Sequence, residues 1–183
     1  MTKKDIKLYN AIFPIWMIVY LSSLLGTKEG FFILFIVLVS NFIIDSLVYL
    51  ISLKKLNIEN KKEKYKKSIL KIWLFGFLAD IIGVIPMFIV NFITNIPMSN
   101  DIRRWINDNF VNAVTYNPFQ NILSFLWVIL CVGISMYCIY KFNYKISMKN
   151  IEIEDEKKKK IALIIAVVTA PYLFLIPTAG FLY

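Results

Sequence analysis

The sequence contains no histidine, only two cysteines and few charged residues for its length. Without histidine the chain cannot build a Ser–His or Cys–His triad or an imidazole metal site, and it lacks the side chain that normally titrates near neutral pH. Cys131 and Cys138 are seven positions apart in one apolar run, about 10 Å along a helix and too distant for a disulfide. A Gly-rich phosphate loop, a Gly-x-Ser-x-Gly elbow and a Cys-x-x-Cys motif are also absent. We therefore expect no cofactor, no metal site and no disulfide scaffold.

Apolar residues are present in excess. Hydrophobic residues make up 58% of the 183 positions and charged residues 18%, whereas soluble domains have roughly 45–50% and about 25%. The mean hydropathy of +0.65 agrees with this high content of apolar residues. The composition excludes a disordered chain and a water-soluble domain, and it predicts a multi-pass protein of the plasma membrane.

Five apolar runs approach or exceed the roughly 20 residues that a helix needs to cross a bilayer. They cover residues 8–26, 31–53, 70–93, 121–140 and 161–183. The first is too long for a signal-peptide core, so we expect it to be a permanent span. The fifth contains Pro171 and is predicted to kink, with a re-entrant or two-part segment as the alternative. The prediction is a single all-α domain over residues 1–183, a polytopic transmembrane helical bundle of five spans.

The distribution of basic residues predicts which ends of the spans face the cytoplasm. The N-terminal tail, the loop 54–69 with the adjoining Lys71, and the loop 141–160 hold eighteen of the 21 Lys and Arg residues. The external loop 94–120 and the turn at Lys28 hold the other three. Because short loops rich in Lys and Arg stay in the cytoplasm, this asymmetry predicts five spans with the N-terminus inside and the C-terminus outside.

The net charge of +9 follows from these loops. Their lysines lie within a few residues of bilayer entry, so the expected partner is anionic inner-leaflet lipid, at about 1 kcal/mol per basic side chain, and not nucleic acid. In the segment 152–160 the acidic residues precede the basic ones, which predicts a solvated helical extension with i,i+4 ion pairs. Five helices form a thin bundle, so we expect a transport path to require a homo-oligomer or another membrane protein.

The external loop 94–120 has a helical pattern of its own. Ser99 and the two residues after it offer N-cap chemistry. The apolar residues that follow recur at helical spacing: Ile102, Trp105, Ile106, Phe110, Ala113 and Val114. This pattern predicts a short amphipathic helix in the outer headgroup region. A helix that caps the mouth of the bundle is the alternative.

Two carboxylates, Asp45 and Asp80, fall inside predicted spans. A charged side chain near the bilayer centre costs at least about 2.5–3.5 kcal/mol and usually faces the interior of the bundle. Asp45 lies eight residues before Leu53, and Asp80 eight residues after Ile72, which places both about 12 Å from the cytoplasmic edge. We therefore expect the two carboxylates at the same depth on neighbouring antiparallel helices, where they would share a proton or bind a cation.

Other polar and small residues are expected near this pair. Asn41 and Tyr49 lie four residues on either side of Asp45, and Asn10 enters the membrane at a similar depth. Gly76 and Gly83 flank Asp80 and form a small-residue face that lets another helix approach. The candidate intramembrane polar site therefore comprises Asp45, Asp80, Asn41, Asn10 and Tyr49.

The sequence leaves several functions open. In one interpretation the aspartates serve only as hydrogen-bonded contacts between helices of a non-enzymatic membrane protein. In another they form a proton or cation relay of a transport or channel-like component. A membrane-embedded hydrolase using Asp45 and Asp80 is an alternative, although the Gly-x-Gly-Asp motif of intramembrane aspartyl proteases is absent at Ala79-Asp80. An accessory or immunity-type protein that binds another membrane protein is the remaining alternative.

Overall fold

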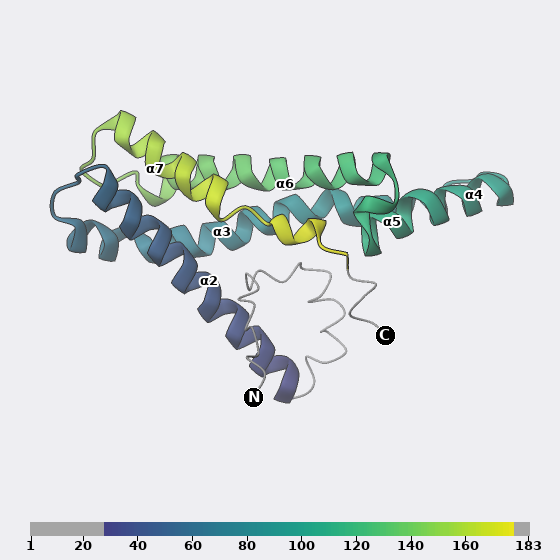
Figure 1. Cartoon of the computed structure of the whole chain (residues 1–183), viewed down its shortest axis with the longest axis horizontal. Coiled ribbons are helices and arrows are strands. Elements are labelled where there is room, and N and C mark those ends of the chain that lie inside the picture. The colour runs from purple at the N-terminus through teal and green to yellow at the C-terminus, as the bar shows by residue number, and fades with distance from the viewer. Residues whose placement is uncertain (1–27, 178–183) are drawn as a thin grey trace, which may run out of the picture.

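The computed structural model describes residues 28–177, and every regular element within them is helical (Figure 1). Three long helices form its body: α2 (Lys28–Lys55), α3 (Lys61–Phe92) and α6 (Ile122–Phe142). A 3-10 turn, Ile93–Asn95, prolongs α3, and a π-helical turn, Asn143–Ser147, prolongs α6.

Three segments of this body are long and apolar enough to cross a membrane: Phe35–Lys55, Lys61–Asn95 and Ile122–Ser147. They overlap the predicted spans 31–53, 70–93 and 121–140. The predicted loop 54–69 is wrong in its second half, because residues 61–69 already belong to α3. The predicted first span, 8–26, lies outside the described residues.

The outward surfaces of these helices are apolar. Leu47, Leu74 and Leu130 expose 54%, 52% and 52% of their surface, while several serines and two aspartates are buried. A water-soluble bundle would place its polar side chains outside and its apolar side chains inside. An extensive exposed apolar surface marks contact with lipid or with another protein, as expected of helices that lie in a bilayer.

The most extensive helix contact joins α3 to α6, which lie alongside one another in Figure 1. A Cβ atom added to Gly83 of α3 would lie 2.7 Å from Ser135 Cβ and 3.0 Å from the Cys131 carbonyl oxygen of α6. A side chain at position 83 would therefore push the two helices apart. The predicted small-residue face is confirmed at Gly83, where the absence of a side chain permits the close approach.

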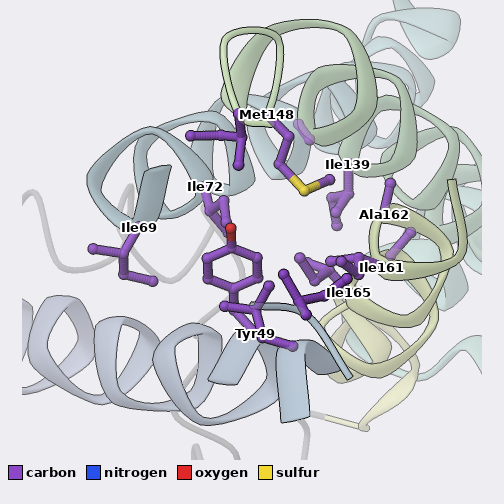
Figure 2. Packing of buried hydrophobic residues seen from close by; sticks show 13 residues of the cluster. Tyr49, Ile69, Ile72, Ile139, Met148, Ile161, Ala162 and Ile165 are labelled. Atoms are coloured by element: carbon purple, nitrogen blue, oxygen red, sulfur yellow. The ribbon is translucent and has the colours of Figure 1, made fainter. Parts of the chain in front are cut away.

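The buried apolar side chains form two clusters along the bundle. The first surrounds Tyr49, which is fully buried among isoleucines of three helices (Figure 2). The Tyr49 hydroxyl and Ser68 Oγ share a hydrogen bond of 2.7 Å, which satisfies this buried phenol. The second cluster includes Val90, Val128 and Phe174 and lies toward the opposite end of α3 and α6.

The segment predicted as the fifth span is divided into two parts. Helix α7 covers Asp155–Val168, and a 3-10 turn, Tyr172–Leu175, follows it. Pro171 has no N–H and its ring would clash with the Val167 carbonyl in a continuous helix. That carbonyl instead accepts a 2.6 Å hydrogen bond from the Tyr172 hydroxyl. The helix therefore breaks where a kink was predicted, in agreement with the two-part alternative.

Both parts of this segment are packed into the bundle. Ile161 and Ile165 of α7 belong to the first apolar cluster, whereas Ala170 and Phe174 belong to the second. The segment thus follows the bundle from one cluster to the other despite the break.

The two lysine-rich loops lie at the same end of the bundle, and the segment carrying Arg103 and Arg104 lies at the other (Figure 1). In the α2–α3 loop, Asn57 and Asn60 adopt left-handed φ values of 50° and 49°, a conformation that Asn tolerates better than most residues. The arrangement gives the described loops the charge asymmetry that the sequence predicted.

The helical extension predicted for 152–160 begins at Asp155, and ion pairs support it. Lys159 Nζ lies 2.7 Å from an Asp155 carboxylate oxygen, and Lys157 pairs with Glu154 at 3.3 Å. Hydrogen bonds from Lys159 and from the Tyr144 hydroxyl lower the pKa of Asp155. The predicted i,i+4 pairing is therefore present, although these exposed pairs contribute little to stability.

The helical segment predicted in the loop 94–120 begins at the predicted cap. Ser99 Oγ accepts a 3.4 Å hydrogen bond from the Ile102 N–H, and α4 (Asn100–Ile106) continues through a π-helical turn, Asn107–Val111, into α5 (Asn112–Tyr116). Ile102 and Trp105 are exposed, whereas Ala113 and Val114 are buried. The first half therefore presents apolar side chains outward, as an interfacial helix would, and the second half caps the bundle.

Candidate functional site

Asp45 of α2 and Asp80 of α3 line the same small cavity inside the bundle. They expose only 8% and 9% of their surface. They belong to the two helices of the α2–α3 hairpin, and Asp45 lies ten residues before the end of α2 at Lys55 whereas Asp80 lies nineteen residues after the start of α3 at Lys61. The cavity measures about 20 Å³, which is room for one water molecule.

Residues from four helices surround these carboxylates. The lining comprises Asn41, Asp45, Trp73, Gly76, Phe77, Asp80, Ile139 and Thr169. A Cβ atom added to Gly76 would lie 3.6 Å from Asp45 Oδ2, so this glycine leaves space beside the carboxylate. The cavity thus lies where α2, α3, α6 and the end of α7 meet.

Ser135 of α6 fixes one of the two carboxylates. Its hydroxyl donates a 2.7 Å hydrogen bond to Asp80 Oδ1. Ser135 is fully buried, and the close approach of α6 at Gly83 brings it within reach of α3. Asp80 is therefore held by a neutral donor and not by a basic side chain.

Two further polar groups at the cavity lack partners within residues 28–177. Asn41 Oδ1 and Trp73 Nε1 are both buried and form no hydrogen bond there. Unpaired polar atoms of this kind are costly in the interior of a protein. Thr169 adds a hydroxyl whose proton is donated to the Ile165 carbonyl at 2.9 Å, so it offers the cavity only lone pairs.

The lining of the cavity contains acidic side chains and no basic side chain. Asp45 and Asp80 are the only ionisable groups in its lining, and neither forms an ion pair among the residues that the structure describes. Burying an unpaired carboxylate is strongly unfavourable unless it takes up a proton or binds a cation. The chemistry available to this pair is therefore the binding and release of protons or small cations.

The structure places some of the predicted site residues at the cavity and others elsewhere. The cavity brings together Asp45, Asp80 and Asn41, as the sequence indicated. Tyr49 is absent from the lining and packs in the first apolar cluster, because its ring fills the space between α2, α3 and α7. Asn10 lies outside the described residues.

Sequence reasoning missed Trp73, Ser135 and Thr169. Each comes from a different helix, and nothing in a single sequence reports which faces of α3, α6 and α7 meet. The spacing of Trp73 and Asp80, seven residues apart on one helix face, was the one available signal.

No protein-family model, curated protein or solved structure matches the chain.

Proposed function

We propose that the chain is a non-enzymatic, multi-pass plasma-membrane protein that acts as a transport or channel-like component through Asp45 and Asp80. The observation that carries the proposal is that two carboxylates from neighbouring apolar helices line one buried cavity without a basic partner among its lining residues. Ionisable residues within membrane spans are rare because burying them is costly. Where they occur, they commonly mark ion or proton pathways.

The proposed topology has five spans with the N-terminus inside and the C-terminus outside. The three long helices supply the spans from 31 to 140. The two-part segment from α7 to Phe174 supports a further crossing, because it contacts the apolar clusters at both ends of the bundle. The lysine-rich end would face the cytoplasm and its anionic lipids.

The cavity favours ion binding over hydrolysis. A hydrolase needs room for its substrate beside the carboxylates, and about 20 Å³ holds a single water molecule. The exposed apolar faces of α2, α3 and α6 suit either lipid or a second membrane protein. We propose that they also join copies of the chain into the oligomer that a complete path would require.

Reconstitution tests this function. Purified chain is placed in liposomes that contain a pH-sensitive dye, and an imposed potential drives cations or protons across the membrane. We expect a faster pH change, or faster uptake of a tracer cation, than in protein-free liposomes. Equal rates with and without the protein, at verified incorporation, would contradict the proposed function.

A further inference from the structure

The cavity between Asp45 and Asp80 has the composition of a cation-binding site. The lining side chains that carry oxygen are Asn41, Asp45, Asp80 and Thr169. Asn41 is only 7% exposed, and its carbonyl oxygen has no hydrogen-bond donor within the described part of the chain. Hydrogen-bond acceptors outnumber donors in this lining even when the unpaired Trp73 N–H is counted, and a positively charged ligand would satisfy the acceptors together.

The break in the fifth segment adds to this negative character. Helix α7 ends at Val168, and its C-cap residue, Thr169, lines the cavity. The last carbonyl groups of a helix lack intrahelical partners and carry the negative end of its dipole. In membrane transporters, interrupted helices of this kind supply such ends to coordinated cations. The Val167 carbonyl is taken by the Tyr172 hydroxyl and the Ile165 carbonyl by Thr169, so α7 contributes to the cavity the Thr169 hydroxyl oxygen and the negative end of the helix dipole.

Size and charge narrow the class of cation. The cavity of about 20 Å³ holds one particle the size of a water molecule, so the cation must be dehydrated. Mg²⁺ usually keeps several water molecules, and Ca²⁺ takes six to eight oxygen ligands. Four oxygen-bearing side chains supply fewer ligands than Ca²⁺ takes and leave no room for the water molecules that Mg²⁺ keeps, so this donor set suits a monovalent cation better.

We propose that this cavity binds one dehydrated Na⁺ ion, with Asn41, Asp45, Asp80 and Thr169 as its ligands, in exchange for one proton. The inference rests on the proposed function and names its substrate class. When both carboxyl groups are protonated, Na⁺ entry breaks one carboxyl O–H bond and the proton leaves to water. One carboxylate then balances the bound Na⁺, the other carboxyl group keeps its proton, and the total charge is unchanged. Within residues 28–177 the facing elements α6 and α7 place no charged side chain in the lining.

Thermal unfolding of the purified full chain in lipid nanodiscs tests the site. The probe is NaCl, compared with choline chloride at the same concentration because choline is too large for the cavity. At a hundredfold excess over the dissociation constant, we expect Na⁺ to raise the melting temperature by about 5 °C or more. In weak buffer, a pH dye should report one proton released for each Na⁺ bound.

Variants locate the effect. Asn41→Ala and Thr169→Val each remove one oxygen ligand and are expected to reduce the difference between Na⁺ and choline. Asn91→Ala is the matched control, because Asn91 also lies on a spanning helix but is exposed and outside the cavity lining. Each comparison is made within one variant, so a general loss of stability does not imitate loss of binding.

Several results would overturn the inference: equal melting temperatures in Na⁺ and choline, stabilisation by Ca²⁺ or Mg²⁺ alone, or a full Na⁺ response in both ligand variants. Liposomes that conduct protons while Na⁺ has no effect would leave the proposed function standing and reject this site. A Na⁺ response in a chain that moves no ions would support the site and contradict the transport function.

Discussion

Asp45→Asn and Asp80→Asn are each expected to reduce ion or proton flux in liposomes to the rate of protein-free vesicles. Asparagine has nearly the shape of aspartate, and at position 80 its carbonyl oxygen can still accept the Ser135 hydrogen bond. Asparagine cannot carry a negative charge or exchange a proton. The substitution therefore removes proton and cation binding and retains the packing of the side chain. Flux is measured with a pH-sensitive dye or a tracer cation after size-exclusion chromatography confirms that each variant is assembled.

Asp108→Asn is the matched control for these two variants. Asp108 lies in the π-helical turn Asn107–Val111, is exposed and is absent from the cavity lining. Its variant should retain wild-type flux. Wild-type flux in Asp45→Asn or Asp80→Asn would show that the carboxylates serve only as hydrogen-bonded contacts between helices.

Gly83→Ala is expected to destabilise the bundle markedly. The added methyl group would lie 2.7 Å from Ser135 Cβ and 3.0 Å from the Cys131 carbonyl oxygen, so α3 and α6 must separate. Overpacking of this kind costs roughly 1–3 kcal/mol, which corresponds to a decrease in melting temperature of about 2–4 °C per kcal/mol for a chain of this size. Thermal unfolding in detergent or nanodiscs measures the change.

Gly133→Ala provides the comparison on the partner helix. A Cβ atom at Gly133 meets nothing within 4 Å, so this change brings only the helix propensity of alanine, a gain of up to about 1 kcal/mol. We expect the two variants to shift the melting temperature in opposite directions. Equal shifts would mean that the close contact at Gly83 does not hold α3 against α6.

The long helices could be predicted from the sequence because their apolar runs exceed the thickness of a bilayer and few other structures tolerate such runs. The Ser99 cap and the acidic-then-basic pattern at 152–160 were also predictable, since both depend on neighbours three or four residues apart. The sequence did not decide whether the helix kinks or ends at Pro171. Whether proline kinks or ends a helix depends on which group takes the freed carbonyl, and here the Tyr172 hydroxyl does so.

The candidate site was predictable only in part. Counting from Leu53 and Ile72 predicted that Asp45 and Asp80 lie close together, which their shared cavity confirms, although α3 begins at Lys61 and not near Ile72. The helical period placed Asn41 beside Asp45. The contributions of Ser135 and Thr169 depend on how α6 and α7 pack, which is set by contacts between residues far apart in the chain. Tyr49 shares the face of Asp45 by periodicity, yet one further helical turn carries it into the apolar cluster.

The proposed topology requires that the apolar helices cross a bilayer with the lysine-rich end in the cytoplasm. Labelling with a membrane-impermeant maleimide tests it directly, using Glu59→Cys or Asp108→Cys in a Cys131→Ser, Cys138→Ser background. Both positions are exposed, and they lie at opposite ends of the bundle. We predict that Asp108→Cys is labelled in intact cells and Glu59→Cys only after permeabilisation. Labelling of Glu59→Cys in intact cells would mean that the lysine-rich end lies outside the cell, contrary to the proposed topology.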